Sequence, residues 1–168
     1  MTSKIQHKIL YTIVLLLIWT VTSQSVSADT LSLPIGQVTV VQNGTVNRIR
    51  LGVDVSALQN TRVDYAEIMI PHFLTTGALT IEGWRLTAQN AVVYDTNYHA
   101  RNTTKASVNL PVILDITDFM QYWVENGNNY GVLLKRPYYE GGGFNGELQG
   151  LRNALANARI RVFYVRER

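Results

Sequence analysis

The chain has 168 residues, 46% hydrophobic and 16% charged, which is typical of one globular domain with its own core. It has no cysteine, which excludes disulfides, thiolate metal sites and a cysteine nucleophile. The formal net charge is +3, and without Lys4 and Lys8 it is +1, from 13 basic and 12 acidic residues. Such a small charge predicts no nucleic-acid partner.

Residues 1–28 are predicted to be a signal peptide. A positively charged start is followed by an apolar stretch over 9–21 and by the small residues Val26, Ser27 and Ala28, which a signal peptidase recognises. The alternative is an uncleaved anchor, but the apolar stretch is shorter than the ~20 residues of a membrane span. We therefore expect a secreted, extracellular or cell-surface protein with no membrane span after cleavage and one domain over 29–168.

Period-two alternation predicts a series of short strands in that domain. The sequence Asn43-Gly44 predicts a hairpin turn, and Pro34 predicts that the first strand lies at a sheet edge. Residues 95–105 and the glycine-rich 138–146 are predicted to be loops. Strands are expected near 31–41, 49–55, 63–72, 79–86, 91–94, 106–116, 130–134 and 159–165.

One short helix is predicted between the expected strands at 106–116 and 130–134. Thr117 is predicted to be the N-cap, because its hydroxyl can accept a hydrogen bond from a free N–H of the first turn. The carboxylate of Asp118 is favourable at the positive end of the helix dipole, and Gly127 can adopt the left-handed conformation of a C-cap. The residues on its apolar face are Phe119, Met120, Trp123 and Val124. Many strands and one helix predict an all-β fold, an antiparallel β-sandwich similar to a jelly roll.

Two motifs in this region resemble the hallmark of the DNRLRE domain family: DITDFMQYW at 115–123 and NNYGVLLK at 128–135. Weaker similarity extends over 47–56, 63–70, 79–86 and 158–164. The resemblance implies a β-sandwich module of bacterial or archaeal surface and secreted proteins, from a family related to alginate-binding carbohydrate-binding modules. Two segments depart from the family pattern, 89–105 and the region before the last strand.

No catalytic signature is present, so no enzyme is expected, and a hydrolase is the third hypothesis. The histidines His72 and His99 lie 27 residues apart in the sequence, without metal-ligand spacing. Two carboxylate pairs could serve a glycosidase: Asp115 and Asp118, which the helix start explains, and Glu82 and Asp95, which lie on or near neighbouring predicted strands. No cofactor or metal ligand set is predicted, although carboxylates and backbone oxygens could hold a structural calcium ion.

Aromatic residues in or beside loops are the strongest functional signal, because sugar rings have apolar faces that stack on exposed aromatic rings. Tyr138 and Tyr139 follow each other on a segment expected to be extended, so one ring should pack and the other be exposed. Core packing is the alternative for Trp84. The predicted ligand-binding residues are Trp84, Tyr94, Tyr98, Tyr138, Tyr139, Arg101 and Arg136, with Phe144 and Asn145 beside them.

The first functional hypothesis is a non-catalytic module that binds a polysaccharide or cell-surface glycan, and cell-surface or matrix association is part of it. The second is a structural or assembly subunit that binds other proteins through a sheet face or edge strand. Glycan binding predicts exposed aromatic rings at one end or face of the sandwich, whereas assembly predicts a broad apolar patch or an uncovered edge.

Overall fold

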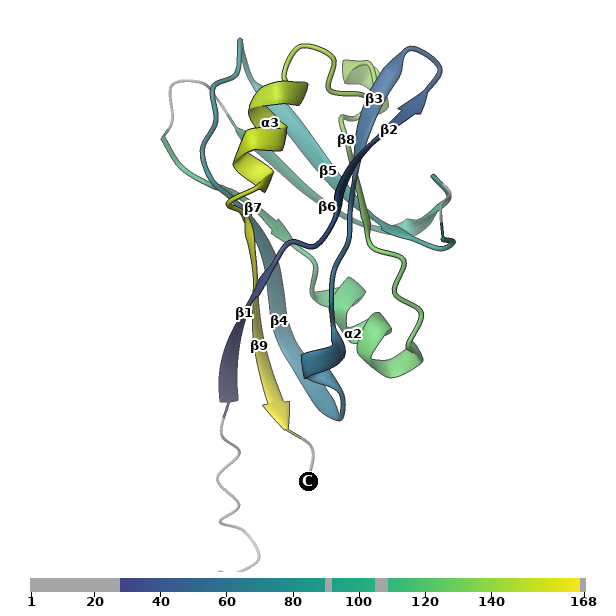
Figure 1. Cartoon of the computed structure of the whole chain (residues 1–168), viewed down its shortest axis with the longest axis vertical. Coiled ribbons are helices and arrows are strands. Elements are labelled where there is room, and N and C mark those ends of the chain that lie inside the picture. Colours follow the sequence, from purple (N-terminus) through teal and green to yellow (C-terminus); the bar gives the residue numbers. More distant parts are fainter. Residues whose placement is uncertain (1–27, 90–91, 105–108, 167–168) are drawn as a thin grey trace, which may run out of the picture.

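Two antiparallel sheets form the protein, as the sequence predicts. The structure, a computed structural model, describes residues 28–89, 92–104 and 109–166. Strands account for 48% of it, and short helices for 18%. In Figure 1 the strands β1, β9 and β4 run together through the lower half, and the second sheet crosses the upper half. The prediction of an all-β sandwich is confirmed.

The first sheet has four strands in the order β1-β9-β4-β7. Every neighbouring pair is antiparallel, and the first strand of the chain pairs with the last. Its strands are β1 (Ala28–Pro34), β9 (Arg159–Arg166), β4 (Thr61–Ile70) and β7 (Val112–Asp115).

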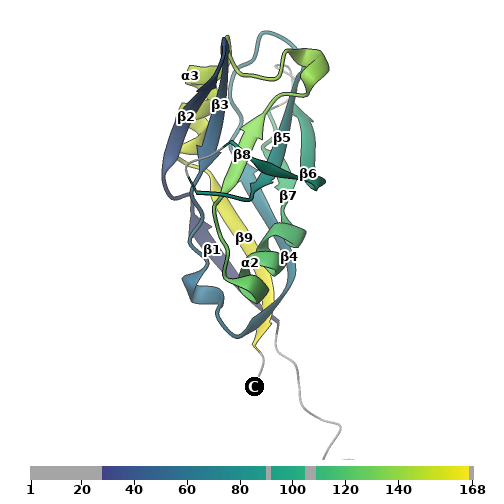
Figure 2. The ribbon, with the colours of Figure 1, turned by 90° about the vertical axis from the view of Figure 1, so that its right-hand side faces the viewer.

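The second sheet has five strands in the order β2-β3-β8-β5-β6, and Figure 2 shows them side by side. Each sheet joins strands from both ends of the chain, β1 with β9 and β3 with β8, as in the interleaved Greek keys of a jelly roll. The strands are β2 (Val38–Asn43), β3 (Val46–Leu51), β8 (Val132–Lys135), β5 (Leu79–Leu86) and β6 (Tyr94–Thr104).

The core lies between the two sheets and follows the period-two alternation. In β3, Ile49 and Leu51 are fully buried, whereas Arg48 and Arg50 point to the other face. Burying one such aliphatic side chain stabilises the fold by about 1.5–3 kcal/mol. Other fully buried core residues are Ile68, Ile70, Ile81, Leu114, Val132, Leu134, Ile160 and Val162.

The predicted helix is present as α2 (Thr117–Asn126), with Phe119, Met120 and Trp123 buried. Gly127 has a φ of 70°, and its N–H donates to the carbonyl of Trp123 at 2.9 Å, which confirms the C-cap. Among the described residues, no helix is long and apolar enough to cross a lipid bilayer.

The predicted N-cap was wrong. The residue before α2 is Ile116, and no side chain caps the helix start. The Thr117 hydroxyl instead accepts a hydrogen bond from the Ala66 N–H at 3.0 Å and donates to Asp115 Oδ1 at 2.6 Å. Thr117 therefore ties the start of α2 to β4, a tertiary contact that the local sequence does not encode.

A second helix, α3 (Leu148–Leu155), corrects the prediction of only one. It buries Leu151, Ala154 and Leu155, and it follows the glycine-rich segment directly. The helix is only eight residues long, and its glycine at 150 disfavours a helical interpretation from local propensity. Packing of its apolar face overrides that propensity.

Two strand predictions also need correction. Residues 31–41 form no single edge strand, because Pro34 ends β1 and the chain crosses to the other sheet before β2 begins at Val38. Residues 95–104 are no loop, because they belong to β6, which pairs with β5 from Thr104 back to Tyr94. Ala91, predicted to start this strand, lies outside the described residues. The Asn43-Gly44 hairpin turn between β2 and β3 is confirmed, with Gly44 at a φ of 62°.

Candidate functional site

The outer face of the five-stranded sheet carries polar and aromatic side chains. A Cβ added at Gly83 would contact Leu114, Val132 and Leu134, so position 83 faces the core. The neighbouring Glu82 and Trp84 therefore point outward, since successive side chains of a strand alternate.

Glu82 is the centre of a hydrogen-bond network on this face. It lies directly opposite Lys135 on β8 and opposite Arg101 on β6. Lys135 Nζ donates to Glu82 Oε2 at 2.7 Å, and Arg101 Nε donates to Glu82 Oε1 at 3.1 Å. The indole N–H of Trp84 donates to Oε2 at 3.1 Å. Three donors on three strands therefore satisfy a carboxylate that is almost fully buried.

The network keeps Glu82 ionised. Burial on its own raises the pKa of this carboxyl, because it penalises the charged form. The hydrogen bonds from Lys135 and Arg101, together with the charge of Lys135, outweigh burial and hold the pKa of Glu82 below its ordinary value. The same bond to Glu82 raises the pKa of the Arg101 guanidinium.

Trp84 is held within a cluster on the same face. The His99 ring stacks on it with centroids 4.5 Å apart, and Tyr94 lies 4.8 Å away at a tilt. Lys135 Nζ lies 4.9 Å from the centroid of the indole ring. His99 belongs to β6 and Lys135 to β8, the strands on either side of β5, so they contact Trp84 from opposite sides. The faces of the indole are therefore covered, and Trp84 supports the cluster instead of offering a flat platform.

Two tyrosine rings are exposed at one end of this face. They belong to the 3-10 turn η2 (Tyr138–Glu140), and the exposed fractions are 92% for Tyr138 and 74% for Tyr139. Glu140 anchors the turn, because its Oε1 accepts from the Thr80 hydroxyl at 2.8 Å and its Oε2 from the Thr80 N–H at 3.4 Å. The expectation that one of the two rings would pack was wrong, because the segment is a turn and not extended.

Arg136 braces the same turn. Its Nη2 lies 3.2 Å from Glu140 Oε2, and its Nη1 lies 3.7 Å from Glu147. Both donors therefore point at carboxylates of the protein itself. Of the predicted arginines, Arg101 is the one with a side chain that is nearly half exposed, at 46%.

The loop after η2 packs onto β3. Phe144, predicted to lie beside the ligand-binding residues, is fully buried, and its N–H donates to the Asn47 carbonyl at 2.8 Å. Asn145 accepts a hydrogen bond from the Asn47 N–H at 3.3 Å. These contacts hold the glycine-rich segment against the sheet.

Tyr98 lies away from the other predicted site residues. It precedes His99 on β6 and points to the opposite side, where it lines a hollow of about 230 Å³ beside α2. Arg85 also lines this hollow, with its guanidinium 3.5 Å from the centroid of Tyr122 and 2.5 Å from Asp95. The structure thus brings together Trp84, Tyr94 and Arg101, with the tyrosines of η2 at one end, and separates Tyr98 from them.

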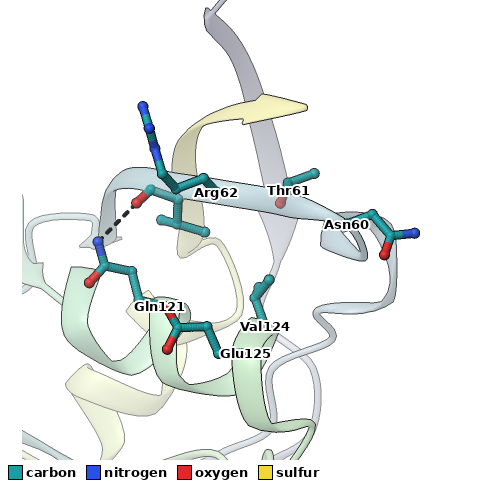
Figure 3. Close-up of a pocket in the computed structure, with 7 residues that line it drawn as sticks. Asn60, Thr61, Arg62, Gln121, Val124 and Glu125 are labelled. Atoms are coloured by element: carbon teal, nitrogen blue, oxygen red, sulfur yellow. Dashed lines mark hydrogen bonds between the residues drawn. The ribbon is translucent and has the colours of Figure 1, made fainter. Parts of the chain in front are cut away.

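A second hollow, of about 370 Å³, lies between the start of β4 and α2 (Figure 3). Gln121 on the helix donates from Nε2 to the Val63 carbonyl at 2.9 Å, which joins the two walls. None of the predicted site residues lines it.

The carboxylates of Glu82 and Asp95, one of the pairs considered for hydrolysis, are engaged in ion pairs. Glu82 bonds to Lys135 and Arg101, and Asp95 bonds to Arg85. Within the described ranges, no group of three or more His, Cys, Asp or Glu side chains is placed to hold a metal ion.

Sequence reasoning missed the cations Arg48, Arg50 and Lys135 as residues of this face, and Glu140 as the anchor of η2. The alternation in β3 does carry the signal, because Arg48 and Arg50 flank a core isoleucine. That Arg48 and Arg50 lie on the same face as Lys135 depends on the pairing of β3 with β8, which are about 80 residues apart in the chain.

No protein-family model matches this chain, and no curated protein matches it in sequence. The resemblance to DNRLRE domains therefore rests on the motifs quoted above and stays a prediction.

Proposed function

We propose that this chain is a secreted, non-catalytic carbohydrate-binding module that binds an acidic polysaccharide on the outer face of its five-stranded sheet. Tyr138 and Tyr139 stack on sugar rings, and Arg101 binds an acidic group of the ligand. The resemblance to DNRLRE domains and the signal-peptide pattern of residues 1–28 agree with this function.

The pair of exposed tyrosines carries the proposal. Two adjacent rings are exposed in the same turn, and their apolar faces suit the apolar faces of sugars. The turn that holds them is fixed by Glu140, which bonds to Thr80 and Arg136. Because the backbone is anchored before a ligand arrives, binding orders little besides the two rings and loses less entropy.

Arg101 supports the choice of an acidic ligand. Its Nε and Nη2 both bond to Glu82, which fixes the orientation of the guanidinium. Nearly half of the side chain remains exposed, and a guanidinium has five N–H donors in a planar fork suited to carboxylates and sulfates. Arg101 also lies close enough to Tyr139 and Glu140 to interact with them electrostatically.

Affinity electrophoresis through gels containing polygalacturonate tests the proposal. The wild-type protein should be retarded, and the double variant Tyr138→Ala/Tyr139→Ala should migrate as it does in a gel without polymer. Its melting temperature should stay within roughly 2 °C of wild type, because exposed side chains contribute little to stability.

Tyr98→Ala is the matched control, since it removes an exposed tyrosine on the opposite side of β6. It should leave the retardation unchanged. If the double variant is retarded as strongly as wild type, the η2 tyrosines are not the binding residues; if wild type is not retarded in any acidic polymer, the proposed function is wrong.

Secretion has its own test. Mass spectrometry of the protein exported from a bacterial host should give a mature N-terminus at Asp29. That cleavage removes only Ala28 from β1, so the pairing of Asp29 with Tyr164 and of the later residues with β9 is retained.

Two observations favour the alternative, an assembly subunit. The edge of β1 opposite β9 has no strand beside it among the described residues. On the outer face of the same sheet, Tyr65, Met69, Ile113 and Phe163 are half-buried apolar side chains. If this face mediates assembly, the protein sediments as an oligomer, and Phe163→Glu converts it to a monomer.

A further inference from the structure

Arg48 lies on the same outer face as Glu82. Neither the sequence analysis nor the proposed function gives it a role. Arg50 is opposite Leu133 on β8, and the two strands are antiparallel. Continuing this register by two residues places Arg48 of β3 beside Lys135 of β8. Its neighbour on the other side is Val41 of β2. One row across the sheet therefore reads Arg48, Lys135, Glu82 and Arg101.

Arg48 differs from the other cations of this face. Lys135 and Arg101 both bond to Glu82, and Arg50 donates to the Tyr130 carbonyl at 3.1 Å. The Nε of Arg48 is shielded from solvent and has no hydrogen-bond partner in the described part of the chain, and no carboxylate there forms an ion pair with it. Arg48 is only half-buried as a residue, and no carboxylate of the described chain balances its guanidinium charge, so this charge is available to a ligand anion.

The charge of the row favours an anion. It holds three cations and one carboxylate, and that carboxylate is already satisfied by Lys135, Arg101 and Trp84. Arg48 and Arg101 stand at its two ends, on β3 and β6. Three strand spacings of about 4.8 Å separate them, or about 14 Å.

We infer that Arg48 is a second anion-binding residue, and that the ligand is a linear polyanionic chain lying across the strands. This inference rests on the proposed function and narrows it. The strands at the two ends of the row are about 14 Å apart, more than one sugar unit spans, whereas a polymer with an acidic group on successive units extends across the whole row. Linking the two contacts in one ligand raises the affinity far above that of either contact alone.

Arg48→Gln tests the inference, because glutamine keeps most of the side chain and removes the charge. Affinity electrophoresis in polygalacturonate should show a roughly tenfold loss of affinity, as expected for a hydrogen bond to a charged group. Repeated over a series of salt concentrations, the variant should also show a shallower decrease of affinity with salt than wild type, because fewer counterions are released.

Arg62→Gln is the matched control. Arg62 is an exposed arginine on the other sheet, paired with Asp64 at 3.1 Å, so this variant loses the same charge away from the row. Its affinity and its salt dependence should equal those of wild type. Galacturonic acid monomer should compete with the polymer only weakly, whereas oligomers long enough to span the row should compete strongly.

The outcomes separate the inference from the function on which it rests. If wild type binds the polymer but Arg48→Gln binds equally well with the same salt dependence, Arg48 is not a binding residue and the inference is overturned. If the monomer competes as well as the oligomers, the ligand is a single sugar and not a chain. If wild type does not bind the polymer, the proposed function itself fails.

Discussion

Glu82 and Lys135 face each other across β5 and β8 and form an ion pair at 2.7 Å in which both side chains are more than nine-tenths buried. They lie on the outer face of the sheet, where solvent would ordinarily reach them. Trp84 and Arg101 bond to the same carboxylate and complete its hydrogen bonds. A buried ion pair needs these additional hydrogen bonds, because the cost of removing both charges from water otherwise exceeds the attraction between them.

Replacing Glu82 with glutamine should therefore destabilise the protein strongly. The substitution leaves the Lys135 ammonium buried without a counter-charge, a change that typically costs about 3 kcal/mol or more. Urea unfolding at neutral pH measures the loss. Glu125→Gln, at an exposed position of α2, is the control and should change stability by less than about 0.5 kcal/mol. Equal stabilities of the two variants would show that the Glu82 network contributes nothing.

The depressed pKa of Glu82 makes part of the stability depend on pH. The ordinary value of this carboxyl is 4.5, and the folded protein holds its pKa below that. The unfolded state then binds the proton more readily, so the contribution is complete above the unfolded pKa and is lost as pH falls through the folded one. The stability difference between wild type and Glu82→Gln should be constant near neutrality and shrink below about pH 4.5. A difference that persists undiminished to lower pH would contradict the ionic role.

Much of the fold could be predicted because alternation and turn signals are local. The strand around Ile49 and the Asn43-Gly44 turn are encoded within a few residues of themselves. The errors fall where tertiary contacts decide. Thr117 resembles a helix cap but bonds to Ala66 of β4, and the polar β6 forms a strand because it pairs with β5 along most of its length.

The candidate site was predictable only in its residue types. Tyr138 and Tyr139 were identified by their proline and glycine neighbours, but their display depends on Glu140 reaching Thr80, 60 residues away in the chain. The sequence leaves open whether Trp84 stacks on a ligand or packs in the core, and the pairing of β5 with β6 and β8 places His99 and Lys135 against its faces. Strand register, which no local pattern specifies, therefore determines which aromatic rings are free.

The hydroxyl of Tyr65 should lose its proton at a higher pH than an ordinary tyrosine. Its hydroxyl donates to Glu67 Oε2 at 2.7 Å, and this bond to a carboxylate, helped by burial, raises the pKa of Tyr65 to about 12. A raised folded pKa gives stability that is present below the unfolded value of about 10 and is lost as pH rises through the folded value. Ultraviolet titration of wild type against Tyr65→Phe isolates this residue from the other eight tyrosines. In Glu67→Gln the pKa of Tyr65 should fall toward 10.0, the ordinary value for tyrosine; an unchanged titration would mean that the bond is not formed.

Trp123→Ala should test whether α2 is part of the core. The indole is 1% exposed and packs beside Phe119 at a centroid distance of 6.2 Å. Truncating a buried tryptophan leaves a large cavity and typically costs ~3–5 kcal/mol. The urea midpoint should fall accordingly, whereas Val124→Ala, at a half-buried position of the same helix, should cost less. Similar midpoints for both variants would place α2 on the surface.

Gly131 and Gly127 offer a matched comparison of two glycines with positive φ, 90° and 70°. At Gly127 nothing lies within 4 Å of an added Cβ. Alanine there should therefore lower the free energy of unfolding only by the cost of its left-handed conformation, about 1–2 kcal/mol. At Gly131 the added Cβ would lie 2.1 Å from the Leu51 carbonyl oxygen. That backbone cannot retreat easily, because the Gly131 carbonyl also accepts the Leu86 N–H at 3.0 Å, so the residue is held between β3 and β5.

Gly131→Ala should therefore force β8 away from β3 and cost more than about 4 kcal/mol, well beyond the loss at Gly127. Because β8 carries Lys135 and β3 carries Arg48, the same displacement should also reduce retardation in polygalacturonate if the variant still folds. Urea unfolding of the two alanine variants side by side measures the difference. Equal losses would mean that the Gly131 backbone lies farther from the Leu51 carbonyl than the 2.1 Å contact of an added Cβ implies. The close approach at Gly131 would then not be what holds β8 against β3.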